Sequence, residues 1–174
     1  DGVAGVEPQS ETVWRQADRY NIPRICFVNK MDRIGADYDR CLSMIREKLY
    51  ARPLPLQMPM GSEDRFSGVV DLVRMKSIVW TDQIGEHFEE REIPPEFAEK
   101  AGAYREQMIE GLAEYNDEIM GAFLEGGDID EHIVRKALRE VTLSSNFFPV
   151  FGGSALKNRG VQPVSGVEQP LACR

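Results

Sequence analysis

Hydrophobic and polar residues follow three successive patterns over the first fifty positions. In residues 6–20, apolar side chains recur at helical spacing behind a proline that suits the first helical turn. Residues 25–28 are apolar at every position, which is typical of a strand covered on both faces of a parallel sheet. Helical spacing returns after Asp37, a candidate helix cap. Helix, strand and helix in this order predict an α/β unit.

The pattern changes at Arg52. Residues 53–60 alternate apolar side chains with proline and glutamine, which favours an edge strand because proline removes donors from the strand ladder. The charged run at residues 86–92 is interpreted as a solvated loop. Strands followed by helices predict an α+β module of different character from the first unit. The further strands are expected at residues 66–73 and 75–80, and the helices at 97–112, 119–124 and 130–141, the second of them indicated by Ile119, Met120, Phe123 and Leu124.

An apolar run at residues 147–151 restores the first pattern and leads into a glycine-rich turn. Pro149 within this run favours a position near a sheet edge or a bulge. We therefore predict one α/β domain that is interrupted by an α+β insert. The expected parts are residues 1–52 and 143–163 for the α/β domain, 53–142 for the insert, and 164–174 for a divergent tail that lacks an apolar stripe and is expected to be disordered.

Composition narrows the class of protein only modestly. The chain has 174 residues, of which 42% are hydrophobic and 29% charged, as in ordinary soluble globular proteins. Its formal net charge of -8 argues against a large phosphate-binding surface, so we expect no direct nucleic-acid site in this segment. No apolar run is long enough to span a bilayer. Because the chain begins in mid-pattern and without a methionine, we expect it to be a piece of a longer protein.

Three polar residues follow the first buried strand. Asn29, Lys30 and Asp32 would lie at the carboxyl end of a parallel strand, where α/β folds bind ligands. A carboxylate accepts two hydrogen bonds side by side, and guanine presents two adjacent donors that adenine lacks, its ring N1–H and its exocyclic amine. The lysine stem can cover the flat face of the base. The pattern N-K-x-D therefore indicates guanine recognition; the simpler alternative is a polar loop in which Asp32 is a local cap.

The glycine-rich turn after the last strand is a second candidate. Gly152 and Gly153 would allow the backbone to approach a ligand closely. The N–H of Ala155 could donate to guanine O6, where adenine presents an amine, and Ser154 could brace the loop or the Asp32 carboxylate. Taken alone this stretch is more simply a turn, but it occupies the same kind of position as the first motif.

Three quoted stretches resemble bacterial-type translation elongation factor G. They are GVEPQSETVWRQADRYNIPRICFVNKMDRIGADY, GSEDRFSGVVDLVRMK and GSALKNRGVQP, and together the resemblance runs from about Asp1 to Pro163. It implies an α/β fold: a partial P-loop GTPase domain with a parallel sheet, interrupted by an α+β inserted subdomain. It also implies GTP or GDP as the ligand, with guanine recognition by Asn29, Lys30, Asp32, Ser154, Ala155 and Leu156.

Other parts of a GTPase are missing from the sequence. No G-x-x-x-x-G-K-[ST] phosphate loop occurs, and Ala4 stands where the γ-phosphate motif D-x-x-G requires glycine. The resemblance implies that the phosphate loop, both switches, the Mg²⁺ site and the catalytic histidine precede Asp1. We therefore expect no catalytic residue and no metal ligand here, with His87 and His132 both solvated, and no GTP hydrolysis by this chain alone.

The resemblance also implies a role for the intact protein. It would hydrolyse GTP to drive movement of tRNA and mRNA on the ribosome, in the cytoplasm of a bacterium or in an organelle, with no membrane association. Its inserted subdomain would contact the stalk protein of the large ribosomal subunit. The alternatives are a sister translational GTPase that acts in ribosomal protection or recycling, and a standalone stalk-protein-binding module.

Overall fold

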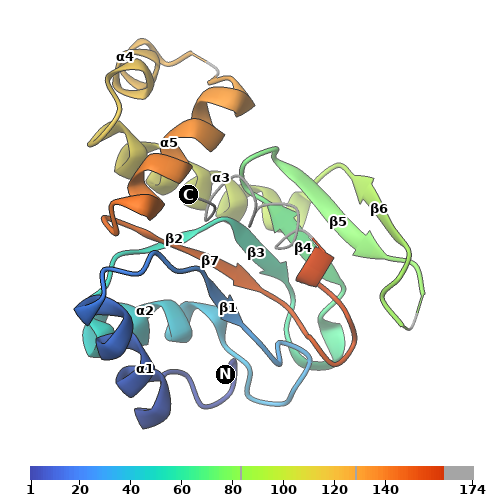
Figure 1. The fold of residues 1–174 in the computed structure, drawn as a ribbon. Helices are drawn as coiled ribbons and strands as arrows, with labels where there is room; N and C mark the ends of the chain where they lie inside the picture. Colours follow the sequence, from blue (N-terminus) through green and yellow to red (C-terminus); the bar gives the residue numbers. More distant parts are fainter. Residues whose placement is uncertain (83, 128, 163–174) are drawn as a thin grey trace.

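A small parallel sheet joins the first and last parts of the chain (Figure 1). The computed structural model describes residues 1–82, 84–127 and 129–162. Within these residues the parallel sheet has the strand order β1-β7-β2, so the last strand lies between two earlier ones. The three strands are β1 (Cys26–Val28), β7 (Phe148–Gly152) and β2 (Pro53–Pro55). Before β2 come two helices, α1 (Pro8–Arg19) and α2 (Tyr38–Leu49).

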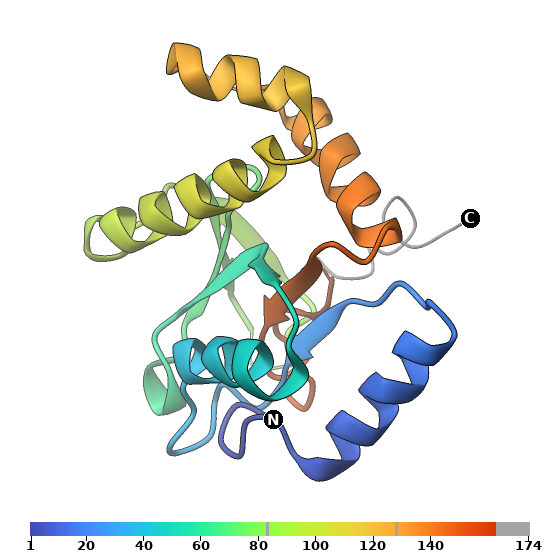
Figure 2. The same cartoon turned by 90° about the vertical axis from the view of Figure 1, so that its left-hand side faces the viewer.

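Among the described residues of the inserted part, the chain forms a four-stranded antiparallel sheet and three helices (Figure 2). The strands follow one another in chain order, and a short 3-10 turn, η1 (Glu63–Arg65), separates the first two. The helices follow the sheet and return the chain to β7. The strands are β3 (Gln57–Met60), β4 (Gly68–Asp71), β5 (Lys76–Trp80) and β6 (Phe88–Arg91), and the helices are α3 (Pro95–Ala113), α4 (Asp117–Glu125) and α5 (Glu131–Leu143). The predicted class, a parallel α/β sheet interrupted by an α+β insert, is confirmed.

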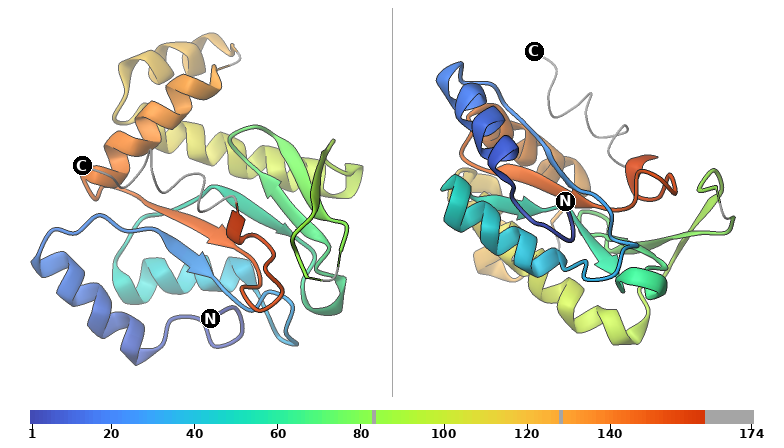
Figure 3. Two further views of the ribbon diagram at one scale, coloured as in Figure 1. Left: turned by 45° about the vertical axis from the view of Figure 1, so that its right-hand side comes forward. Right: turned by 90° about the horizontal axis from the view of Figure 1, so that it is seen from below.

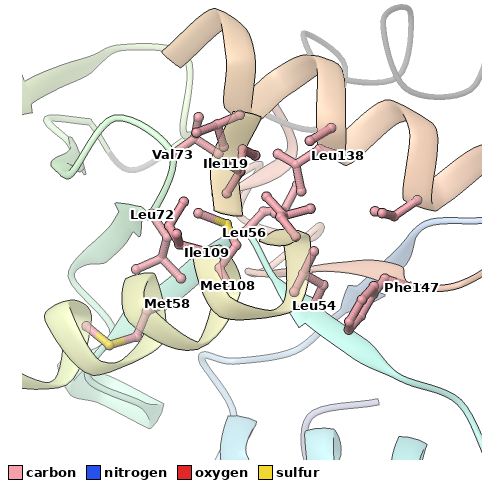
Figure 4. Close-up of a cluster of buried hydrophobic side chains, with 14 of the residues drawn as sticks. Leu54, Leu56, Met58, Leu72, Val73, Met108, Ile109, Ile119, Leu138 and Phe147 are labelled. Atoms are coloured by element: carbon pink, nitrogen blue, oxygen red, sulfur yellow. The ribbon is translucent and has the colours of Figure 1, made fainter. Parts of the chain in front are cut away.

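Side chains of β7 alternate between two hydrophobic clusters, because successive residues of a strand point to opposite faces. Phe148 and Val150 lie in a cluster with α2 and the start of the chain, on one face of the parallel sheet. Phe147 and Phe151 lie in a second cluster that includes buried residues of α3, α4 and α5 (Figure 4). This second cluster contains side chains from both sheets, so the inserted part shares its core with the parallel sheet.

Helix boundaries agree closely with the sequence pattern, and their capping chemistry is present. Pro8 begins α1, and Asn21 just after its end has a left-handed backbone with φ of 49°. The Asp37 carboxylate accepts from the N–H of Arg40 at 2.9 Å and caps α2. Gly126 closes α4 in the left-handed conformation, as expected for a helix end. Each of these helix ends depends on a single residue, which explains why the sequence predicts the helix boundaries well.

The proline-rich run at residues 53–60 forms two strands in different sheets instead of one, and each of them lies at an edge of its sheet, as the prolines indicated. Leu56 lies at the junction of the two sheets. Its N–H donates to the carbonyl of Val150 at 2.9 Å, and its own carbonyl accepts from the N–H of Leu72 at 3.0 Å. The sequence gives no sign of this division, because alternation continues across it. The predicted insert, 53–142, thus starts with a strand that pairs in the parallel sheet.

Pro149 lies in the middle strand of the parallel sheet, not near an edge as the sequence suggested. The strand accommodates Pro149 because the backbone groups of this residue point away from β2, as the hydrogen bonds of its two neighbours show. On the β2 side, Phe148 donates to the Arg52 carbonyl and Val150 accepts from Leu56, so Pro149 faces β1. The first residue pair between β1 and β7 is Cys26 with Val150, one residue further on. The missing N–H of proline therefore falls just before that ladder begins.

One further prediction about the insert is wrong. The charged run at residues 86–92 contains the strand β6, whose residues are all exposed. Charged residues are common on edge strands, where they discourage pairing with other chains. In α4 only Ile119 is buried, whereas Met120, Phe123 and Leu124 are exposed. The predicted helix therefore forms, and most of its large apolar side chains are exposed.

Candidate functional site

The two predicted loops lie side by side at the carboxyl ends of β1 and β7 (Figure 3). Parallel pairing of these strands brings their following residues to the same edge of the sheet. Backbone hydrogen bonds then continue past the strands: Gly153 N–H donates to the Val28 carbonyl, and Met31 N–H donates to the Gly153 carbonyl, both at 3.0 Å. The loops of residues 29–32 and 153–156 are therefore held together by main-chain contacts before any side chain is considered.

The Asn29 side chain ties the two loops together. Its Oδ1 accepts from the N–H of Lys30 at 2.8 Å and from the N–H of Ala155 at 2.9 Å. From the sequence we expected the Ala155 N–H to donate to a ligand, but in this structure it donates to Asn29 Oδ1. Through Ala155, Asn29 therefore links the first loop to the second.

Asp32 lies opposite the second loop, and its side chain is only 11% exposed. Its Oδ2 is 3.2 Å from the Nζ of Lys157. Burial acts to raise the pKa of the Asp32 carboxyl, but hydrogen bonds from Ser154 and Lys157 outweigh it, and the pKa lies below its ordinary value. Asp32 is therefore a carboxylate at neutral pH, with acceptor oxygens and no proton to donate.

Lys30 has an uncommon backbone, with φ of 66° in the left-handed region. Its ammonium forms an ion pair with the carboxylate of Asp1. The Asp1 Oδ1 also accepts from the N–H groups of Val3 and Ala4, at 2.9 and 3.2 Å, so the partner of Lys30 is itself held in place. The first turn of the chain thereby positions the lysine of the motif.

A hollow of about 610 Å³ lies beside the first loop. This size is within the range of small-molecule sites. Lys30 contributes an ammonium to the lining of this hollow, and Asp32 contributes a carboxylate. Its lining residues are Asp1, Val3, Ala4, Lys30, Asp32, Arg33 and Ile34.

The second loop is closed by backbone hydrogen bonds and exposed at its tip. Ser154 is 1% exposed, and its N–H and carbonyl pair with those of Arg159 at 2.9 Å in both directions. Leu156 is 85% exposed, so its apolar side chain is free to cover the face of a ligand. All six residues predicted for base recognition thus belong to two adjacent loops, although Asn29 and Ala155 already bind each other.

The family model of the elongation factor Tu GTP binding domain matches residues 1–169 of this sequence. The chain belongs to this GTP-binding domain family. A crystal structure of a protein from Thermus thermophilus is also similar, with a TM-score of 0.85 and 26% sequence identity. The match covers 99% of this chain and 25% of the Thermus chain, so this chain spans about a quarter of that protein.

Membership in this family of translational GTPase domains implies binding of a guanine nucleotide. The residues of the two loops fit the base, because the Asp32 carboxylate supplies acceptors for the two adjacent donors that distinguish guanine. The sequence contains no G-x-x-x-x-G-K-[ST] motif that would bind the phosphates of the nucleotide. Among the residues that the structure describes, no group of three histidine, cysteine or acidic side chains could hold a metal ion.

Three residues at the site were not predicted from the sequence. Lys157 directly follows the predicted loop, and its pairing with Asp32 could have been suspected from charge alone. Asp1 pairs with Lys30 across 29 positions, for which the sequence offers no signal. Gly85 of the β5–β6 hairpin contacts the second loop through its carbonyl, which accepts from Asn158 Nδ2 at 3.2 Å. The inserted sheet therefore contacts the segment that directly follows the second loop.

Gly153 is predicted to be essential for the shape of the second loop. A Cβ at this position would lie 2.2 Å from the carbonyl oxygen of Arg159, so the backbone would have to move. We expect Gly153→Ala to lower the free energy of unfolding by about 1–3 kcal/mol, as overpacking does elsewhere. Urea unfolding measures this change.

The matched control is Gly121→Ala in α4, where a Cβ would meet no atom within 4 Å. This control is expected to leave stability unchanged or to raise it by up to about 1 kcal/mol, because alanine favours the helix. Equal stability of the Gly153→Ala variant and the unaltered chain would contradict the tight approach of the two loop segments.

Proposed function

We propose that this chain recognises the guanine base for a translational GTPase of the elongation factor G type. The observation that carries the proposal is the meeting of two loops at one sheet edge. The N-K-x-D loop and the Ser-Ala-Leu loop follow neighbouring parallel strands and are tied by the 2.9 Å hydrogen bond from Ala155 to Asn29. Two sequence segments separated by more than a hundred residues thus supply one binding surface.

Each residue has a distinct role in this proposal. The Asp32 carboxylate accepts from N1–H and the exocyclic amine of guanine, and it presents the wrong groups to adenine. Asn29 holds the second loop so that the Ala155 N–H lies near the base edge, where it can be shared with guanine O6. The Lys30 stem and the exposed Leu156 side chain cover the two faces of the base.

The elongation factor G assignment rests on the finer resemblance of the three quoted stretches. In that assignment the intact protein hydrolyses GTP with Mg²⁺ and drives translocation of tRNA and mRNA on the ribosome in the cytoplasm. The inserted subdomain contacts the ribosomal stalk protein. This chain contributes base recognition, and phosphate binding and catalysis depend on residues beyond those in its sequence.

Base selection by the chain itself is the test of this proposal. We expect saturation-transfer NMR with equal millimolar concentrations of guanosine and adenosine to show transfer to guanosine alone. Nucleosides are used because the proposed contacts reach only the base and need no phosphate site. Equal transfer to both nucleosides would contradict guanine recognition.

The sister GTPases of ribosomal protection and recycling share the same base chemistry, so nucleoside selection does not separate them from elongation factor G. An assay of tRNA and mRNA movement in a single round of translocation would separate elongation factor G from these sister GTPases. A standalone stalk-binding module is less favoured, because the inserted helices share a hydrophobic cluster with β2 and β7. A stalk-protein pull-down from a nucleotide-free mixture would support that module only if guanosine selection also failed.

A further inference from the structure

Lys157 lies directly against the carboxylate that is proposed to recognise the base. Its Nζ is 3.2 Å from Asp32 Oδ2, and its side chain is 43% exposed while that of Asp32 is 11% exposed. The ammonium therefore lies between the solvent and the half-buried carboxylate. Lys157 is not among the six residues of the two base-recognition motifs.

The Asp32 carboxylate has about four acceptor positions on its two oxygens. A hydrogen bond from Ser154 and the contact from Lys157 use positions on the protein side. Guanine needs two adjacent acceptors for its N1–H and its exocyclic amine. The backbone N–H of Asp32 is a further internal donor, so these contacts together hold the carboxylate on its protein side. We propose that Lys157 is a positioning residue that orients Asp32 for the two donors of guanine, an inference that rests on the proposed base recognition.

The start of the Lys157 side chain is fixed by the loop that carries it. The Lys157 N–H donates to Ser154 Oγ at 3.3 Å, and on its other side Asn158 is held by the carbonyl of Gly85. Ser154 in turn pairs with Arg159 in both directions. The lysine side chain therefore extends from an anchored backbone, and its Nζ lies 3.2 Å from Asp32 Oδ2.

The positive charge of Lys157 also favours the ionised form of the Asp32 carboxylate. Burial acts to raise the pKa of Asp32, and the hydrogen bonds from Ser154 and Lys157, with the positive charge of Lys157, bring it below its ordinary value. Asp1, Lys30 and Arg33 line the same hollow, and they remain when Lys157 is replaced. Removing Lys157 leaves the burial and takes away one stabilising donor, so the pKa of Asp32 rises.

The pH dependence has a definite sign. A protonated carboxyl presents one O–H donor in place of an acceptor, so it meets a guanine donor with another donor. Base binding is therefore present above the Asp32 pKa and is lost as the pH falls through it. With Lys157 replaced, this loss begins at a higher pH than in the unaltered chain.

The test uses the 174-residue chain and three variants, Lys157→Met, Lys157→Arg and the exposed-residue control Lys136→Met. Carboxyl ¹³C NMR follows the titration of Asp32, and NMR titration with guanosine and inosine gives the two affinities. Inosine lacks the exocyclic amine, so the ratio of affinities reports recognition of that group. We expect Lys157→Met to raise the Asp32 pKa, to weaken guanosine binding about fivefold and to reduce the guanosine-to-inosine ratio.

Lys157→Arg is expected to restore most of the affinity, because it keeps the charge and the donors, and Lys136→Met is expected to change nothing. An unchanged Asp32 titration and unchanged guanosine affinity in Lys157→Met would overturn the inference. Tighter guanosine binding would also overturn it, because Lys157 would then compete with the base. Failure of the unaltered chain to bind guanosine would instead overturn the proposed function, while the Asp32 titration still reports the contact.

Discussion

Replacement of Asp32 by asparagine is expected to convert a guanine preference into a xanthine preference. The amide would turn its NH₂ toward the exocyclic amine of guanine, and one hydrogen bond would become a contact between two donors. Xanthine carries an oxygen in place of that amine and keeps N1–H, so the donor and the acceptor of the amide both find partners. Sites built on buried hydrogen bonds discriminate by about 10⁴ to 10⁵, so the change in preference is large.

Competition between GDP and xanthosine diphosphate measures this change most sensitively in a protein that joins this chain to a phosphate-binding half. Asp117→Asn is the matched control, because it makes the same chemical change at an exposed position of α4. That control is expected to keep the original guanine preference. If Asp32→Asn also keeps the original margin for GDP, Asp32 does not contact the base, and the N-K-x-D stretch is only a polar loop.

Phe151→Ala is expected to cause the largest loss of stability among the substitutions considered. Phe151 is 1% exposed in the middle strand of the parallel sheet, and it belongs to the cluster that also contains Leu54 and Leu56. Truncation leaves a cavity among side chains from both sheets and from the inserted helices. Loss of a buried phenylalanine costs about 3–5 kcal/mol, which is a large part of the stability of a domain this size.

Urea unfolding followed by circular dichroism measures this loss, and Leu124→Ala is the control. Leu124 is 76% exposed in α4, so its truncation is expected to change the free energy of unfolding by no more than about 0.5 kcal/mol. A loss below about 1 kcal/mol for Phe151→Ala would contradict the shared core of the two sheets. Because Phe151 precedes the second loop by two residues, we also expect weaker guanosine binding in this variant.

Local chemistry explains what the sequence predicts well. Asp37 and Gly126 act at helix ends through their own side chain or backbone freedom, so they are visible without knowledge of neighbours. The two loops were predicted because each follows an apolar run and carries a recognisable pattern, N-K-x-D in the first and Gly-Gly-Ser-Ala in the second. Parallel pairing of β1 with β7 then brings the loops together, and this pairing follows from the α/β pattern.

Contacts between distant segments explain what the sequence does not predict. The division of the proline run depends on Leu56, whose backbone bonds to Val150 and Leu72. The strand β6 exists because β5 supplies a partner for a charged segment that has no pattern of its own. The pairing of Lys30 with Asp1 likewise depends on tertiary structure. The predicted tail, residues 164–174, lies outside the residues that the structure describes.

The most direct test of guanine recognition is amide-resolved NMR of the chain during titration with guanosine, with adenosine as the comparison. We expect guanosine to shift the amide signals of residues 29–32 and 154–157, and in particular that of Ala155, whose N–H now donates to Asn29. Adenosine should leave these signals in place. Shifts confined to other parts of the chain, or equal shifts with both nucleosides, would contradict a guanine site formed by these two loops.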